Sequence, residues 1–219
     1  MIWDWQYTLE ILPDLAHAAI VTVEPTFLSF IFAAILGLVL AILRMRGGVT
    51  GWITSAVIET IRSTPLLIQI FFIFFVLPRY GVALDAFTAG IIALSRHYGC
   101  YCSEVYRAGI EAVPRGQWEA CIALNVSGWN TLKNIILPQA IPPVVPALGN
   151  LLVALFKDTP LLSAIAVLEL VQTAKILGSE NFRYTEPMTI VGITFLILSL
   201  ISSAGIRWVE KRLNLRSVR

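Results

Sequence analysis

Eight ionisable side chains lie within or beside the long apolar stretches of this sequence. They are five acids and three bases: Glu24, Glu59, Glu104, Asp158, Glu169, Arg62, Arg96 and Lys157. A charge at the centre of a bilayer costs about 2.5–3.5 kcal/mol on insertion scales, so such residues pair, face a wet cavity or lie near an interface. Both signs occur at similar depth, which suits a zwitterionic solute better than a simple anion or an apolar compound.

Five of these residues and one hydroxyl form our candidate substrate pathway: Glu59, Arg62, Arg96, Glu104, Asp158 and Thr159. We expect the stretch 157–160 to lie beside a cavity, because Pro160 leaves a helix carbonyl without its donor. Irregular backbone at membrane depth survives only where protein buries it or water reaches it. The alternative is structural: Glu59 and Arg62 are three residues apart and can pair on one helix face, and 157–160 can mark the outer end of a span.

Motifs for covalent or hydrolytic chemistry are absent from the sequence. It contains no G-x-x-x-x-G-K-[ST] phosphate loop, no G-x-S-x-G elbow and no H-E-x-x-H zinc motif. Cys100, Cys102 and Cys121 form no C-x-x-C pair, and only His17 and His97 could join them as ligands, so we expect no metal and no cofactor. We therefore expect no enzyme activity, and any coupling to ATP needs a partner chain.

The composition indicates an all-α integral membrane protein. Hydrophobic residues make up 57% of the 219 residues, charged residues 14%, and the net charge is +2, whereas soluble domains carry about a quarter charged residues. This charge is too small to indicate a nucleic-acid partner. A helix needs about 20 apolar residues to cross the hydrocarbon, and about five such spans are predicted: 15–43, 52–77, 86–108, 141–171 and 188–206.

Charged residues and prolines along the chain set the expected boundaries. We divide the chain into an external segment 1–14 with acids among aromatics, a transmembrane domain 15–210 and a basic tail 211–219. Glu24-Pro25 is expected to interrupt the first span, and the prolines at 138, 142, 143 and 146 are expected to exclude a regular helix there. The 31 residues of 141–171 exceed a bilayer core, which predicts a break near Asp158–Pro160. The polar stretch 172–187 is expected to be an external loop.

Lysines and arginines are distributed unequally between the two sets of loops. One side has ten: Arg44, Arg46, Arg107, Arg115, Lys133, Arg207, Lys211, Arg212, Arg216 and Arg219. The other side has three: Arg79, Lys175 and Arg183. By the positive-inside rule, we expect an external N-terminus, a cytoplasmic C-terminus and a cytoplasmic loop between the third and fourth spans.

That loop has a distinctive pattern at 117–138. Its apolar spacing predicts two short amphipathic helices that meet at Ser127-Gly128, with Pro138 ending the second. Glu119-Ala120-Cys121, three residues, Asn125, nine residues and Ile135-x-Leu137-Pro138 resembles the EAA loop of bacterial type I ABC-importer permeases. Cys121 stands where that family usually has Ala, and Asn125 where it has Gly, although Asn tolerates the left-handed region well.

The resemblance implies a coupling helix, within 111–138, that docks on a cytoplasmic ATPase. The residues implied in that contact are Glu119, Ala120, Asn125, Val126, Ser127 and Gly128. It also implies the ABC type-1 transmembrane fold in the bacterial inner membrane. The implied partners are ATPase subunits, a second copy or a related permease, and an extracytoplasmic solute-binding protein.

Two further stretches narrow the resemblance. ETIRSTPLLIQ at 59–69 and the segment 101–120 are similar to permeases of the polar-amino-acid uptake family. The opening MIWDW and the EILP at 10–13 are similar to permeases for ectoine and hydroxyectoine. The implied solute is an amino acid or an amino-acid-like compatible solute such as ectoine. Arg96 departs from the family pattern, where a small or apolar residue is usual, and it either marks specificity or reaches towards an interface.

Two other functional classes compete with this interpretation. A stand-alone secondary transporter driven by protons or sodium would use the intramembrane acids as relays. Such carriers usually contain duplicated halves, and no internal repeat is visible here. A membrane-embedded enzyme would need a nucleophile, metal cluster or acid–base pair, and none can be named.

Overall fold

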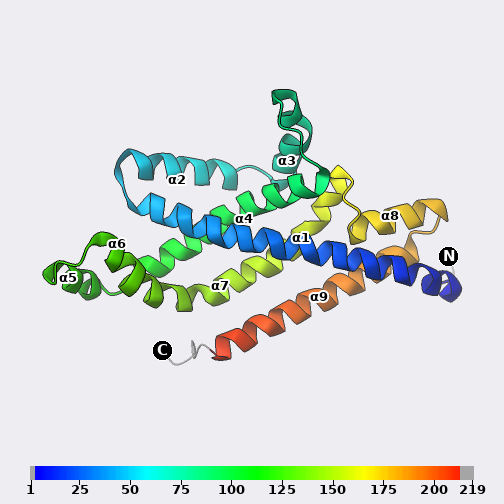
Figure 1. The fold of residues 1–219 in the computed structure, drawn as a ribbon. Helices are drawn as coiled ribbons and strands as arrows, with labels where there is room; N and C mark the ends of the chain where they lie inside the picture. Colours follow the sequence, from blue (N-terminus) through cyan, green and yellow to red (C-terminus); the bar gives the residue numbers. More distant parts are fainter. Residues whose placement is uncertain (1–2, 213–219) are drawn as a thin grey trace.

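The computed structural model describes residues 3–212, which contain helices and turns and no strand (Figure 1). The helices are α1 (Trp5–Met45), α2 (Gly48–Arg62), α3 (Leu66–Phe71), α4 (Ala86–Glu111), α5 (Arg115–Ala123), α6 (Gly128–Thr131), α7 (Leu137–Asp158), α8 (Leu170–Glu180) and α9 (Thr185–Arg212). The all-α prediction is therefore confirmed for these residues. Residues 213–219, most of the expected basic tail, and the first two residues of MIWDW lie outside the described range.

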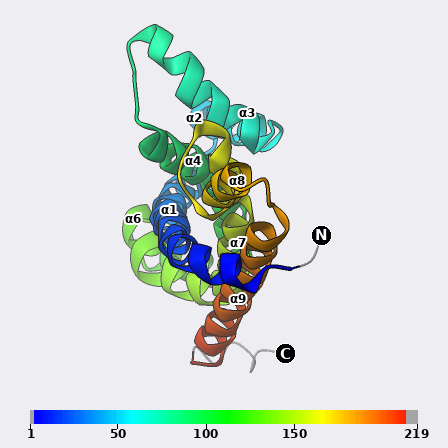
Figure 2. The same ribbon diagram turned by 90° about the vertical axis from the view of Figure 1, so that its right-hand side faces the viewer.

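The long helices run side by side, with α1 against α4, α4 against α7, and α7 against α9 (Figures 1 and 2). Small residues allow the close approach of α1 to α4. A Cβ added to Gly37 would lie 2.5 Å from the Cβ of Cys102 and 2.8 Å from the carbonyl oxygen of Gly99. Close backbone packing of this kind replaces the hydrophobic driving force that helices lack within lipid.

Helix α1 is longer than the predicted span and carries no interruption. Asp4 caps it by accepting hydrogen bonds from the backbone N–H of Gln6 and Tyr7, and its 41 residues extend about 60 Å. The expected break at Glu24-Pro25 is wrong, because the helix continues through Pro25. Within the helix, the hydroxyls of Thr22 and Thr26 bond the carbonyls of Ala18 and Thr22 at 2.9 Å and 2.8 Å, so these buried polar side chains are satisfied inside α1.

The second predicted span is wrong as a single helix. It consists of α2 and the segment Leu66–Tyr80, which are bent by 104° relative to each other. The bend lies at Ser63-Thr64-Pro65, where proline disfavours the helical conformation of the residue before it. Gln69 stabilises the bend, since its Nε2 donates to the carbonyls of Ile61 at 2.7 Å and Thr64 at 2.9 Å.

The proline-rich start of the fourth span is helical, contrary to prediction. Helix α7 runs through Pro142, Pro143 and Pro146, and Pro138 lies in its first turn instead of ending a helix. A widened π-helical turn, Leu132–Ile136, precedes it, and such bulges accommodate an interrupted hydrogen-bond ladder. The predicted break at the other end is confirmed, because the α-helix gives way at Thr159 to the 3₁₀ segment Thr159–Ile165.

The stretch expected as a loop at 172–187 contains most of α8, so that prediction is wrong. Glu169 caps α8 by accepting from the N–H groups of Val171 and Gln172. Leu170, Ala174 and Gly178 form its buried face against α1 and α9, with the four-residue spacing of an amphipathic helix.

Within residues 3–212, three helices are long and apolar enough to cross a membrane, or four if the bent pair counts as one span. Helix α4 is not among them by composition, although its 26 residues extend about 39 Å through the middle of the bundle (Figure 1). The number of about five spans therefore remains a prediction. α5, α6 and the end of α9 lie at one end of the molecule, and the N-terminus and α8 lie at the other (Figure 1).

Candidate functional site

A row of polar and aromatic side chains follows one side of α4. We call it the α4 polar row, and it consists of Arg96, His97, Tyr98, Tyr101 and Glu104. His97, Tyr101 and Glu104 are four and three residues apart and lie on successive turns of one face, and Arg96 and Tyr98 flank His97 on either side of that face. The row faces the bend between α2 and α3 at one point and the end of α7 at another, as the contacts below show.

The first part of the row meets the bend through Gln69. Arg96 Nη2 donates to Gln69 Oε1 at 3.2 Å, and Gln69 Nε2 lies 3.1 Å from His97 Nδ1. The Gln69 residue is only 3% exposed. Gln69 therefore bonds the carbonyls of the bend and also contacts Arg96 and His97 of the row.

The end of α7 contacts the row through its acid. The Tyr98 hydroxyl donates to Asp158 Oδ2 at 2.7 Å, which places Asp158 beside the row. Thr159 is fully buried, and its hydroxyl lies 2.8 Å from that of Thr26 and bonds the Leu155 carbonyl at 3.0 Å. In this conformation Thr159 joins α7 to α1.

Glu104 forms the other end of the row and binds three arginines, which come from α1, α2 and α4 itself. It binds Arg44, Arg62 at 3.3 Å and Arg107 at 2.9 Å, and Arg107 also binds Glu111 at 2.7 Å. The Glu104 side chain is 21% exposed, whereas that of Glu111 is 60% exposed.

The alternative of a Glu59–Arg62 pair is not realised in this conformation. Arg62 is the last residue of α2, and its guanidinium turns to Glu104 and stacks 5.1 Å from the Tyr101 ring centre. Glu59 is exposed and forms no ion pair within residues 3–212. Tyr101 lies 5.1 Å from the His97 ring, so the row is continuous from the arginine cluster to Gln69.

Sequence reasoning included Arg96, Glu104 and Asp158 but missed Gln69, Tyr98 and Tyr101 as members of the site. Gln69 was visible as a polar residue between apolar ones, four residues after Pro65. Tyr98 and Tyr101 were visible only as a spacing of three on an expected helix, which is also the spacing of an ordinary packed face.

The residues expected to contact the ATPase lie at the end of the molecule that carries α5 and α6 (Figure 1). Asn125 ends α5 in the left-handed conformation, with φ 53°, and the N–H of Val126 bonds the carbonyl of Cys121 at 2.9 Å. Asn reaches this conformation more readily than most residues, which explains how it substitutes for Gly. Ser127 occupies the N-cap position of α6, although its side chain forms no capping bond.

The surface of this element is exposed and partly apolar. Glu119, Ala120, Asn125, Ser127 and Gly128 are exposed, and Val126 is half-buried. Three large apolar side chains that the sequence did not single out lie among them and are 60–78% exposed: Ile122, Leu124 and Trp129. Apolar groups clustered among polar ones outside the hydrocarbon mark a protein-interaction surface.

Residues 33–215 match the family described as "binding-protein-dependent transport system inner membrane component". The chain belongs to this family. It is 45% identical to the probable amino-acid ABC transporter permease protein y4tG of Sinorhizobium fredii, covering 97% of this chain and 92% of that protein. It is 39% identical to the L-cystine transport system permease protein TcyB of Bacillus subtilis, covering 92% and 87%.

The fold matches a solved transporter of the same kind. The crystal structure of an amino acid ABC transporter with histidines superposes with a TM-score of 0.88 at 33% identity, over 97% of this chain and all of that one. The chain is thus an inner-membrane permease subunit, whose partners are ATPase subunits, another permease and a solute-binding protein. This confirms the predicted family and decides against a stand-alone carrier or an enzyme.

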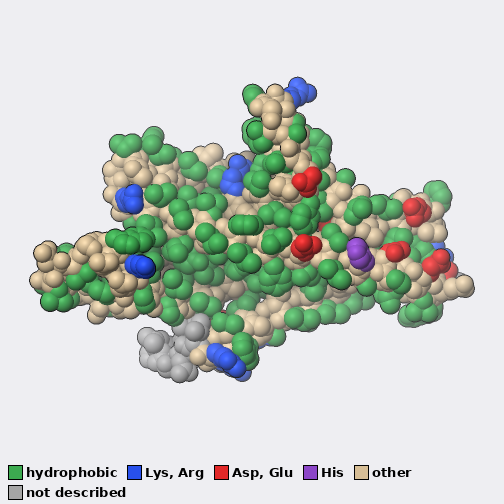
Figure 3. All heavy atoms as spheres, viewed as in Figure 1, with side chains coloured by type: hydrophobic (Ala, Val, Ile, Leu, Met, Phe, Trp, Pro, Cys, Tyr) green, Lys and Arg blue, Asp and Glu red, His purple; other side chains and the backbone are tan. Residues whose placement is uncertain are grey.

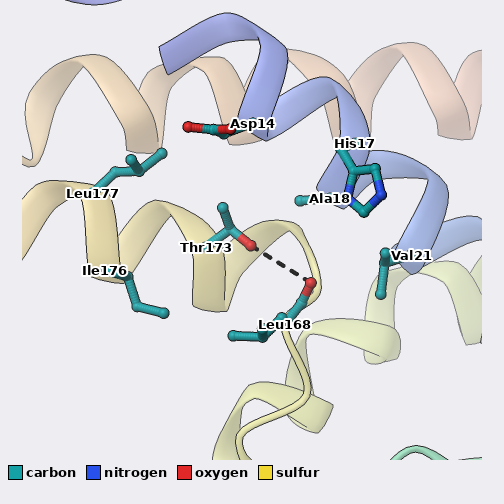
Figure 4. Close-up of a pocket in the computed structure, with 8 residues that line it drawn as sticks. All are labelled: Asp14, His17, Ala18, Val21, Leu168, Thr173, Ile176 and Leu177. Carbon is teal, nitrogen blue, oxygen red and sulfur yellow. Dashed lines mark hydrogen bonds between the residues drawn. The ribbon is translucent and has the colours of Figure 1, made fainter.

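A separate recess of about 430 Å³ lies between α1 and α8 in this permease subunit (Figure 4). Asp14 and His17 project into it from α1, and Thr173, Ile176 and Leu177 come from α8 (Figure 4). The recess lies at the end opposite to α5 and α6, far from the α4 polar row, so it takes no part in the site described above.

The shared carboxylate of Glu104 predicts a difference between two glutamates on one helix. Glu104→Gln leaves three guanidinium groups without their sheltered acid and should lower the free energy of unfolding by about 2 kcal/mol. Glu111→Gln removes an exposed partner of the same Arg107 and should change the free energy of unfolding by less than about 0.5 kcal/mol. Thermal melts of the detergent-purified permease measure both. Equal shifts for the two variants would contradict the assigned role of Glu104.

Proposed function

We propose that this permease carries a small zwitterionic amino acid into the cytoplasm. The observation that carries the proposal is the α4 polar row, which presents guanidinium, hydroxyl and carboxylate groups beside two interruptions of regular helix. The names of its relatives support it, since they are a probable amino-acid permease and an L-cystine permease. The superposed structure is described as an amino acid ABC transporter with histidines.

The solute site that we propose lies between the row, the bend at Ser63–Pro65 and the end of α7. Non-helical backbone at membrane depth is tolerated where it lines a water-filled cavity, and both interruptions contact the row through Gln69 and Asp158. The site must bind weakly, because a solute held tightly would not leave. Affinity then comes from the solute-binding protein.

Ectoine is the narrower candidate for the solute. The supporting residues are MIWDW at 1–5 and EILP at 10–13, and the described ones lie in the N-terminal turns of α1 or directly before it. None of them contacts the row, so this part of the resemblance carries less information about the solute than the row does.

The coupling element that we propose is α5 with the turn 124–128. Helix α4 connects it to the row, and Ile110 and Val113 pack with Ile136 and Ala140 beneath it. ATP-driven approach of the ATPase subunits would move the exposed turn, and this packed joint would pass the motion to α4 and α7. Glu119, Ala120, Asn125, Val126, Ser127 and Gly128 form the contact in this proposal.

Transport in liposomes tests the proposed function. The permease, its ATPase and its solute-binding protein should accumulate L-cystine or L-histidine when ATP is enclosed with the ATPase, and a pH or sodium gradient alone should drive none. Ectoine is tested in parallel, and uptake of ectoine alone would replace the amino acid as the solute. Accumulation driven by an ion gradient without ATP would contradict the proposal.

Gly128 offers a sharp test of the coupling surface. A Cβ added there meets nothing within 4 Å, so Gly128→Val should leave folding unchanged while it obstructs a docked partner. We expect uptake to fall at least tenfold with an unchanged melting temperature. Gly192→Val is the matched control, because its Cβ also meets nothing within 4 Å. Normal uptake and normal ATPase stimulation in Gly128→Val would exclude the turn from the contact.

The orientation that we propose places α5, α6 and the C-terminus in the cytoplasm. In the face shown in Figure 3, acids lie towards the N-terminal end and most bases towards the other, in line with the positive-inside rule. A reporter active only in the cytoplasm should therefore function after Arg219 and fail when inserted between Asn181 and Tyr184. Activity at the second position only would reverse the orientation.

A further inference from the structure

Arg96 differs from the other arginines that contact α4. Arg44, Arg62 and Arg107 all reach Glu104, whereas Arg96 has no carboxylate within 4.0 Å in the part of the chain that the structure describes. Its contact is the neutral Oε1 of Gln69, and its Nε is buried without a hydrogen-bond partner. Among the described residues, the guanidinium therefore has no acid to offset its charge, and its Nε–H has no acceptor.

The depth of Arg96 makes this arrangement costly. It lies ten residues into α4 and fifteen before its end, or about 15 Å and 22 Å from the two helix ends. Lipid phosphates lie near the ends of such a helix. A charge that is retained so far inside the membrane without an internal partner marks a functional site.

A pocket of about 380 Å³ borders the guanidinium, which is the one charged group lining it among the described residues. The remaining lining comes from one side of α2: Trp52, Ile53, Ala56, Val57, Thr60 and Ile61. This volume is within the range of small-ligand sites. An apolar wall with one guanidinium at its edge matches a small molecule that carries a carboxylate.

Gln69 holds the guanidinium at this edge. Its Nε2 is fixed to the carbonyls of Ile61 and Thr64, so its Oε1 is oriented towards Arg96. A guanidinium binds a carboxylate through two parallel N–H donors, which a lysine cannot reproduce. We propose that Arg96, positioned by Gln69, binds the carboxylate of the transported solute and selects it over uncharged analogues.

This inference rests on the proposed import of a zwitterionic solute, but a binding experiment tests it separately. The permease–ATPase complex is purified in detergent without the solute-binding protein. Its melting temperature is followed while L-cystine, L-histidine or ectoine is added, each beside its carboxamide. In the wild type, at least one carboxylate should stabilise the complex at a concentration at least tenfold lower than its carboxamide.

Arg96→Gln should abolish this preference, and Arg96→Lys should keep part of it, because the charge remains but the paired donors do not. Arg79→Gln, which removes an exposed arginine from the turn Leu77–Tyr80, should leave the preference unchanged. If the wild type prefers the carboxylate but liposomes show no import, the proposed function fails and the role of Arg96 stands.

Three results would overturn the inference. The wild type could show no preference for any carboxylate, or Arg96→Gln and Arg96→Lys could retain the full preference. Alternatively, the two permease copies could elute as separate subunits on size-exclusion chromatography in both variants. That result would show that Arg96 pairs with an acid of the second permease, for which the exposed Glu59 on α2 is the candidate.

Discussion

The cost of an unsatisfied polar group in hydrocarbon governs this structure. A carbonyl that a proline frees, or a charge that enters the membrane, costs free energy unless it finds a partner in the protein or faces water. The buried hydroxyls of Thr26 and Thr159 bond each other, Gln69 binds the carbonyls at the bend before α3, and Glu104 binds three arginines from three helices. These partners hold α1, α2, α3 and α4 in one arrangement that apolar packing alone would leave free to slide.

The same constraint connects the two functional elements. Helix α4 carries the polar row, and its last turns pack with the residues beneath α5. Glu104 lies between them and ties α4 to Arg44 of α1 and Arg62 of α2. A displacement of the exposed turn at 124–128 therefore reaches the row through one helix and one ion-pair cluster, and the bend at Ser63–Pro65 follows directly after Arg62 of that cluster.

Composition and the spacing around Glu119 were sufficient to predict the helical class and the family, and the length of 141–171 was sufficient to predict the break near Thr159. Local proline rules failed in α1 and α7. Helix α1 continues through Pro25, and α7 continues through three prolines after a π-helical turn, and neither outcome can be read from spacing. The alternative Glu59–Arg62 pair could not be decided from the sequence, since a spacing of three permits a pair but cannot show that Glu104 on α4 binds Arg62 instead. Gln69 was missed because its role depends on a bend of 104°, which only the folded chain reveals.

The central claim is that the α4 polar row lies on the solute pathway. The most direct measurement is a cryo-electron microscopy structure of the assembled importer with its amino acid bound. The account predicts solute density within hydrogen-bond distance of Arg96 and beside the row, with Gln69 still bonded to the carbonyls of Ile61 and Thr64. Solute density elsewhere, with Arg96 facing acyl chains or an acid of the second permease, would contradict it.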